Sequence, residues 1–215
     1  MQQLVNSILT SKAKIISIDG VDAAGKTTFA YQLSNELKKI NKKAMVISID
    51  HFHQPKEIRY QKGVDSPHGF YLDSYDYNTF INRCVMPFRY GDKKILTQSF
   101  NLQKNIQEEV YCELDNDTIM LVEGIFLHRD ELFELWDYSI YLDVKIETSW
   151  ARNLKRSLES NPNLDIENYK SRFHKRYRAG QEFYFEKCRP KLRASMVINN
   201  NNNLLIQNSE FKINI

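Results

Sequence analysis

The sequence predicts an α/β fold in which a five-stranded parallel sheet is flanked by helices. Short apolar runs alternate with longer helix-compatible segments, as in strand–helix–strand crossover units. The runs are apolar throughout, which is typical of strands buried on both faces. A loop with a glycine at each end joins the first run to the first helix. The five predicted strands are residues 14–19, 44–49, 118–124, 138–143 and 196–199.

Length and composition limit the possible classes of protein. We expect the 215 residues to form a single domain, residues 1–215. The net charge of +3 is too small to argue for or against a nucleic-acid partner. The three cysteines are widely spaced, which disfavours a disulfide framework or a zinc site. The first 14 residues lack the apolar core of a signal peptide, so we expect a cytoplasmic protein without a membrane partner.

The loop after the first predicted strand reads Gly20-Val21-Asp22-Ala23-Ala24-Gly25-Lys26-Thr27. A glycine-flanked loop that opens a helix aims backbone N–H groups and the helix N-terminus at one anion, which is typical of a phosphate-binding loop. Lys26 would add a charge for the β- and γ-phosphates, and the Thr27 hydroxyl would ligate Mg²⁺. The sequence therefore predicts a P-loop NTPase fold that binds a nucleotide through Gly20, Asp22, Ala23, Ala24, Gly25, Lys26, Thr27 and Thr28.

Residues 1–13 are expected to form a short helix or arm, and residues 28–40 a helix that leads to the second strand. Asp50 follows that strand. Ligands of open parallel sheets bind at the carboxyl ends of the strands, so Asp50 should share a rim with the phosphate-binding loop. We predict a catalytic role for its carboxylate, and an ordinary cap or turn residue is the alternative.

Residues 51–72 contain proline, glycine and histidine without periodicity, which predicts a long loop of the kind that often carries function. Its candidate substrate contacts could equally be surface or turn residues, and the histidines lack metal-like spacing. A helix over 75–88 follows, with Asp73-Ser74 as its expected N-cap. The candidate substrate contacts are His53, His68, Tyr71 and Asp73.

Residues 94–100 and 109–114 alternate loosely around 101–108, which predicts a small β-hairpin flap over the rim, at about 94–114. The third strand of the sheet is clearer and ends in Glu123. A carboxylate at that position can serve as a second acid that organises Mg²⁺ in a phosphate-loop enzyme.

The segment 146–159 is a predicted helix with an apolar stripe that should face the core. Arg152 and Arg156 lie on another face, one turn apart and just before a break at Pro162. We expect them to bring positive charge to the phosphates from a mobile helical lid, at about 152–172. A solvated helix face is the alternative. The stripe consists of Ile146, Trp150, Leu154 and Leu158.

The region 170–193 holds nine basic and two acidic residues and could bind a polyanion. In a nucleotide-binding protein the nearest polyanion is the triphosphate, so we expect no nucleic-acid partner. The run Asn199–Asn203 is interpreted as a turn or a compositional bias.

Several classes of protein share a phosphate-binding loop, and other motifs separate them. A GTPase should carry Asp-x-x-Gly after the third strand and Asn-Lys-x-Asp for guanine, and neither is present. A Leu-Ser-Gly-Gly signature of transport ATPases is also absent. A small kinase remains, a class in which phosphoryl transfer depends on positioning and charge neutralisation.

From about residue 14 to 200 the sequence resembles the uridine kinase-like branch of the P-loop kinases, which includes nicotinamide riboside kinase, pantothenate kinase and phosphoribulokinase. It is most similar to bacterial uridine kinase-like proteins, and four motifs in order carry the resemblance. These are Asp50-His51-Phe52-His53-Gln54-Pro55, Ser66-Pro67-His68-Gly69-Phe70-Tyr71 with Asp73-Ser74-Tyr75-Asp76, Val122-Glu123-Gly124-Ile125-Phe126, and Arg176-Tyr177-Arg178-Ala179-Gly180-Gln181 leading to Cys188-Arg189-Pro190.

The resemblance implies a role for each matching residue. Asp50 resembles the acid that accepts the proton of the substrate hydroxyl and helps to hold Mg²⁺. Glu123 resembles the Walker B-type acid, and Asp73 the carboxylate that binds ribose hydroxyls. Arg152 and Arg156 resemble lid arginines, and the resemblance leads us to expect that Arg178 faces the phosphates.

Two departures concern the acceptor. Uridine–cytidine kinases carry a second arginine cluster in the lid, where this chain has Ser160-Asn161-Pro162-Asn163. Their hairpin supplies a histidine to the pyrimidine base, and residues 96–105 contain none. The sequence therefore defines the reaction better than the acceptor.

The resulting prediction is a kinase that transfers the γ-phosphoryl group of Mg²⁺-bound ATP to the 5′-hydroxyl of uridine or cytidine. The alternatives are the same chemistry on a non-nucleoside alcohol and a non-catalytic nucleotide-binding regulator. The predicted catalytic residues are Lys26, Asp50, Arg152 and Arg156, the metal ligands are Thr27, Asp50 and Glu123, the substrate contacts are His53, Tyr71 and Asp73, and Arg178 joins the loop in nucleotide binding.

Overall fold

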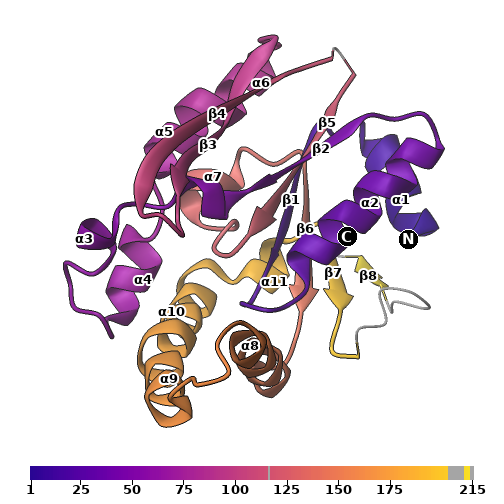
Figure 1. Cartoon of the computed structure of the whole chain (residues 1–215). Coiled ribbons are helices and arrows are strands. Elements are labelled where there is room, and N and C mark those ends of the chain that lie inside the picture. Colours follow the sequence, from indigo (N-terminus) through magenta and orange to yellow (C-terminus); the bar gives the residue numbers. More distant parts are fainter. Residues whose placement is uncertain (116, 203–210, 214–215) are drawn as a thin grey trace.

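A computed structural model describes residues 1–115, 117–202 and 211–213 of the chain (Figure 1). Its main sheet has the strand order β2-β5-β1-β6-β7-β8, and the first five of these strands are parallel. The five predicted parallel strands are therefore confirmed. The parallel strands are β1 (Ile15–Gly20), β2 (Ala44–Ser48), β5 (Ile119–Gly124), β6 (Tyr138–Asp143) and β7 (Met196–Asn199), and β8 (Phe211–Ile213), which was not predicted, pairs antiparallel with β7.

Both faces of the sheet are covered, which explains why β1 and β5 are buried along their whole length. On one face, α1 (Gln2–Ser11) and α2 (Lys26–Lys39) supply Leu4, Ile8, Phe29 and Leu33 to a core with Ile16 and Ile18 of β1. The other face packs against a second core rich in aromatic side chains. No helix in the described part of the chain combines the length and apolar character needed to cross a membrane.

The long segment after β2 differs from the predicted loop because short helices organise it. A 3-10 helix (Ile49–Phe52) is followed by α3 (Lys56–Arg59) and α4 (Pro67–Asp73). The Ser66 hydroxyl caps α4 by accepting from the Gly69 amide at 3.1 Å. Helices of four to seven residues are too short to show a clear hydrophobic period, which explains why the sequence pattern did not predict them.

The predicted helix over 75–88 exists, but its start was placed too early. Its cap is Asp76, whose carboxylate accepts from the Thr79 amide at 2.9 Å, and not Asp73-Ser74. The helix is also interrupted by a π-helical turn. Its parts are α5 (Tyr77–Phe80), the π turn (Ile81–Val85) and α6 (Met86–Tyr90).

The antiparallel hairpin of β3 (Lys94–Asn101) and β4 (Ile106–Glu113) forms a separate two-stranded sheet (Figure 1). Ile95, Leu96 and Phe100 of β3 are buried, whereas β4 is mostly exposed. The pairing register shifts twice between Leu96 and Phe100.

Between β6 and β7 the chain is mostly helical. The apolar stripe of α8 (Ile146–Ser160) does not face the core, so that prediction is wrong. The buried residues of α8 are the polar Ser149 and Asn153, and Trp150 packs instead against Tyr169 and Phe173 at ring distances of 5.7 and 4.8 Å. The other helices are α7 (Asp130–Phe133), α9 (Ile166–Arg172), a π-helical segment (Phe173–Arg178), α10 (Ala179–Cys188) and α11 (Pro190–Arg193).

Candidate active site

The phosphate-binding loop lies between the end of β1 and the start of α2, as expected. Gly25 is the N-cap of α2 and has a left-handed conformation with φ of 88°, which favours glycine. The Lys26 side chain is buried in the loop, and its Nζ donates to the Val21 carbonyl at 2.9 Å. The first amides of a helix have no partner within the helix, so the loop presents free donors and a cation together.

A cavity of about 430 Å³ brings the loop together with the carboxyl ends of β2 and β5. Eleven of the predicted site residues line it, and six lining residues were not among the predicted site residues. The predicted ones are Asp22, Ala23, Gly25, Lys26, Thr27, Thr28, Asp50, His53, Glu123, Arg152 and Arg156, and the others are Phe70, Tyr75, Leu102, Gly124, Ile125 and Tyr177.

Asp50 has an exposed carboxylate that the Tyr75 hydroxyl orients. Tyr75 donates to Oδ1 of Asp50 at 2.8 Å, which leaves Oδ2 open to the cavity. Burial and the nearby Asp50 charge raise the pKa of Tyr75 well above its ordinary value, so the phenol keeps its proton at neutral pH. Tyr75 belongs to the motif Asp73-Ser74-Tyr75-Asp76, but the sequence did not indicate that its hydroxyl would contact Asp50.

His53 packs its ring against Tyr75 at 4.5 Å, and its Nδ1 lies 2.8 Å from the Asp50 carbonyl oxygen. A carbonyl oxygen only accepts, so Nδ1 carries the hydrogen. Burial lowers the pKa of His53 below its ordinary value, although the Asp50 charge opposes the shift. The neutral ring therefore leaves Nε2 as a hydrogen-bond acceptor.

Glu123 is 4% exposed and lines the cavity, and within the described residues its carboxylate has no hydrogen bond or ion pair. In the register of the sheet it lies between Ile18 of β1 and Ser48 of β2. A buried carboxylate without a protein partner suits a cation, and oxygen ligands such as Thr27, Asp50 and Glu123 suit Mg²⁺. No cluster of three or more His, Cys, Asp or Glu in the described residues could hold a metal.

The two arginines of α8 differ in their surroundings. Arg152 donates to the carbonyls of Asn200 at 2.8 Å, Asn201 at 3.0 Å and Ala23 at 3.4 Å. Arg156 is more exposed, and its Nη2 lies 3.5 Å from Oδ1 of Asp22. Most of the donors of Arg152 are therefore committed to the protein backbone.

Four candidates from outside the phosphate-binding loop do not reach the cavity. Tyr71 is fully buried, with its hydroxyl 3.3 Å from the Cys188 sulfur, so it is a core residue and its prediction as a substrate contact is corrected. Asp73 is paired with Lys62 at 2.5 Å and Arg178 with Glu182 at 2.7 Å. His68 packs on Phe183 at 5.0 Å. None of the four lines the cavity.

Gly20 and Ala24 belong to the loop but lie on its packed side. A Cβ on Gly20 would approach the Leu142 carbonyl oxygen at 2.7 Å, and Ala24 is fully buried. Both residues therefore pack closely under the loop and do not line the cavity, and their predicted contact with nucleotide stays a prediction.

A buried polar cluster below the loop was missed by the sequence analysis. Oδ1 of Asp19 accepts from the Gly20 amide at 2.7 Å, and Oδ2 accepts from Nδ1 of His128 at 2.7 Å and from the Tyr184 hydroxyl. Asp19 is fully buried, so these bonds anchor the start of the loop. The sequence does contain a sign of this cluster, because Asp19 is an acidic residue at the end of an otherwise apolar strand.

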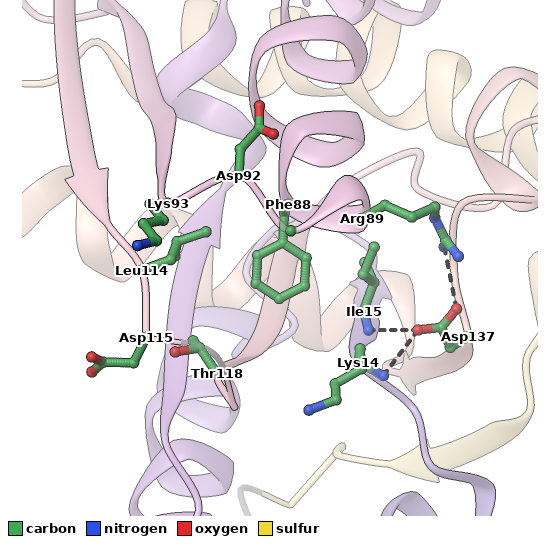
Figure 2. Close-up of a pocket in the computed structure, with 11 residues that line it drawn as sticks. Lys14, Ile15, Phe88, Arg89, Asp92, Lys93, Leu114, Asp115, Thr118 and Asp137 are labelled. Carbon is green, nitrogen blue, oxygen red and sulfur yellow. Dashed lines mark hydrogen bonds and ion pairs between the residues drawn. The ribbon is translucent and has the colours of Figure 1, made fainter.

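A second cavity, of about 480 Å³, lies at the other end of the sheet, near the base of the hairpin (Figure 2). Three basic and three acidic side chains line it, and Asp137 is already engaged by Arg89 and by the amides of Lys14 and Ile15. No predicted site residue lines this cavity, and its balanced charge offers no phosphate cradle.

Comparisons with known proteins agree with this geometry. The sequence matches the Phosphoribulokinase / Uridine kinase family over residues 15–179. It is 24% identical over 156 residues to a uridine kinase of Lactobacillus helveticus (strain DPC 4571), covering 69% of each chain. It is also 24% identical over 155 residues to a uridine kinase of Saccharomyces cerevisiae (strain ATCC 204508 / S288c), covering 68% of this chain but only 29% of that relative.

Solved structures show the same fold. A possible uridine kinase from Bacillus stearothermophilus superposes with a TM-score of 0.72 at 22% identity, covering 91% of this chain and 95% of the other. A D-glycerate 3-kinase from Cryptococcus neoformans var. grubii serotype A superposes with a TM-score of 0.66 at 10% identity, covering 99% and 98%. Together with the family match over most of its length, these likenesses show that the chain belongs to the phosphoribulokinase/uridine kinase family of P-loop kinases.

Proposed function

We propose that this kinase transfers the γ-phosphoryl group of ATP to the 5′-hydroxyl of uridine or cytidine. The observation that carries the proposal is that the phosphate-binding loop, Asp50 and Glu123 line one cavity. The loop is the donor half of such a site, and Asp50 lies where an acceptor hydroxyl would meet the phosphate.

Asp50 is proposed as the general base. Its Oδ1 is occupied by the Tyr75 hydroxyl, so Oδ2 would accept the proton of the acceptor hydroxyl. The new bond joins the acceptor oxygen to the γ-phosphorus, the bond to the bridging β–γ oxygen breaks, and ADP leaves. Lys26 and Arg156 would balance the phosphate charge. Mg²⁺, held by Thr27, Asp50 and Glu123, would supply further charge neutralisation.

Aromatic side chains in the cavity lining support a nucleoside as the acceptor. Phe70, Tyr75 and Tyr177 contribute aromatic side chains that suit a planar base. Nε2 of His53 would accept a hydrogen bond from a sugar hydroxyl near Asp50. Among the described residues, the lining near Asp50 and His53 contains no Lys or Arg side chain that could bind a second anionic group on the acceptor.

A second candidate is the same reaction on a non-nucleoside alcohol. The observation that favours it is the hairpin, which contributes only the aliphatic Leu102 to the cavity among the described residues. Leu102 cannot read the polar edge of a pyrimidine by a hydrogen bond.

The test is the release of ADP from ATP and Mg²⁺ with uridine, cytidine, nicotinamide riboside, pantothenate and simple sugars as separate acceptors. Stimulation by uridine or cytidine supports the first candidate, and stimulation by another alcohol alone supports the second. If no hydroxyl compound stimulates turnover while the protein binds ATP, the kinase proposal is wrong and a nucleotide-binding regulator replaces it.

A further inference from the structure

We propose that Ser149, Arg152 and Asn200 form an outer bracket that holds the phosphate-binding loop in its binding conformation. They are positioning residues for the phosphates of the donor, because they hold the loop's backbone rather than taking part in the transfer. The inference rests on the proposed use of ATP as the donor. It assigns a role to Asn200 and revises that of Arg152.

The bracket holds three consecutive carbonyl groups of the loop. The Ser149 hydroxyl donates to the Asp22 carbonyl at 2.8 Å, and Nδ2 of Asn200 donates to the Ala24 carbonyl at 2.7 Å. Between them, Nη1 of Arg152 makes a longer contact of 3.4 Å with the Ala23 carbonyl. None of the donors belongs to the loop motif itself.

The geometry of the peptide group means that a hydrogen bond to a loop carbonyl also sets the direction of the amide that follows it. The C=O and N–H of a planar trans peptide point to opposite sides. Holding the Ala24 carbonyl on the outer side therefore directs the Gly25 amide toward the start of α2, where the anion would bind. The loop also contains Ala23 with φ of 52°, a left-handed conformation that is unfavourable for a non-glycine residue. Hydrogen bonds from outside the loop offset that cost.

Asn200 is closely fitted to the loop. It is 1% exposed, and a Cβ on Gly25 would lie 2.9 Å from Nδ2 of Asn200. Since the Ala24 carbonyl can only accept, the amide nitrogen must face it. An aspartate at position 200 would place a negatively charged oxygen against that carbonyl with almost no change of shape.

Hydrogen bonds also join the members of the bracket to one another. Arg152 donates to the carbonyls of Asn200 and Asn201 at 2.8 and 3.0 Å. Oδ1 of Asn201 accepts from the amide of Lys145, the cap residue of α8, at 2.8 Å. The segment after β7, the polar face of α8 and the phosphate-binding loop therefore form one network. Ser149 and Asn153, and not the apolar stripe, are the buried residues of α8, because Ser149 donates to the Asp22 carbonyl and Asn153 to the Asp22 carboxylate at 3.1 Å.

The test compares donor and acceptor parameters in Asn200→Asp and Ser149→Ala. Calorimetry with ADP gives the dissociation constant, and steady-state kinetics give separate KM values for ATP and the acceptor. We expect Asn200→Asp to weaken ADP binding about tenfold, equivalent to about 1.4 kcal/mol, and to raise the KM for ATP similarly. Ser149→Ala should weaken both about threefold, and in both variants the acceptor KM should stay within about twofold of wild type.

Asn202→Asp is the matched control. It adds the same charge two positions away on an exposed side chain, and its ADP affinity should match wild type. The bracket is overturned if Asn200→Asp keeps wild-type affinity, if both KM values rise equally, or if Asn202→Asp loses as much affinity. If Asn200→Asp fails to fold by circular dichroism, Ser149→Ala decides alone, and unchanged ADP affinity in it overturns the bracket.

The wild-type protein separates this inference from the proposed function. If wild type binds ADP but phosphorylates no acceptor, the proposed function fails while the affinities of the variants still decide the bracket. If wild type binds neither ADP nor ATP, the proposed donor and the bracket are both overturned.

Discussion

At the scale of single residues, the acceptor side depends on how Asp50, His53 and Tyr75 share hydrogen bonds. Tyr75 donates to the Asp50 carboxylate, and His53 donates to the Asp50 backbone. The two rings pack together at 4.5 Å, so each fixes the orientation of the other. One oxygen of Asp50 and one nitrogen of His53 are thereby left available to the proposed acceptor.

Removing the Tyr75 hydroxyl should therefore slow the chemical step. In Tyr75→Phe we expect kcat to fall by about threefold to thirtyfold, corresponding to roughly 1–2 kcal/mol, because Asp50 loses the donor that orients it. The KM for ATP should not change. Tyr77→Phe is the matched control, since it removes a neighbouring phenol that makes no hydrogen bond to Asp50. Equal kcat values in the two variants would contradict the role given to Tyr75.

His53 should make stability depend on pH in the acid range. Its pKa is lowered in the folded protein by burial, so below the ordinary value of 6.5 the unfolded chain binds a proton that the folded chain does not. The free energy of unfolding should therefore decrease as the pH falls below about 6.5. His53→Asn, which keeps an N–H near the Asp50 carbonyl, should reduce this decrease.

Urea denaturation at pH 7.5 and pH 5.5 measures the effect. His51→Asn, at an exposed position two residues away, is the control and should follow wild type. The assignment is contradicted if wild type and His53→Asn lose the same stability between the two pH values.

At the scale of elements, α8 has two functional faces. Its polar face bonds to the phosphate-binding loop, and its apolar stripe packs against the helices that follow. Phe173 is buried but belongs to neither of the two main cores, so Trp150 of α8, Tyr169 of α9 and Phe173 form a small aromatic packing unit of their own. This supports, without testing it, the prediction that residues 152–172 act as a lid.

Trp150→Ala should loosen that unit while the sheet stays intact. The substitution removes the ring that contacts Tyr169 and Phe173, and we expect a local cost of about 2–4 kcal/mol. Hydrogen exchange should then speed up in residues 146–172 but not in β1 or β5. Tyr31→Ala, an aromatic truncation at an exposed position on α2, is the control. Uniformly faster exchange across the sheet would show that α8 is part of the global core instead.

At the scale of the whole molecule, the parallel sheet brings segments that are far apart in the sequence together at one site. β1, β2 and β5 are neighbours, so their carboxyl ends bring the phosphate-binding loop, Asp50 and Glu123 to one rim (Figure 1). Continuous apolar runs and the loop motif predicted this much from the sequence, because buried parallel strands have a strong local signature.

The features that were missed depend on tertiary contacts. The stripe of α8 has the period of a core-facing helix, and nothing local shows that a polar face would bind the loop instead. Tyr71 resembles its neighbours in a functional segment, yet the fold turns it into the aromatic core. Asn200 lies in a run of asparagines, and the composition of that run gives no sign that its side chain donates to the Ala24 carbonyl. Periodicity and motifs do not encode which distant backbone group a side chain meets.

The central claim is that Asp50 acts as the base in phosphoryl transfer from ATP, and a single-turnover measurement of Asp50→Asn tests it most directly. The carboxylate is 59% exposed, so the variant should fold, and its affinity for ADP measured without magnesium should match wild type. With the acceptor identified by ADP release, we predict that the rate of phosphoryl transfer falls by about 10²- to 10⁴-fold. A variant that binds ADP normally and transfers phosphate at the wild-type rate would contradict the account.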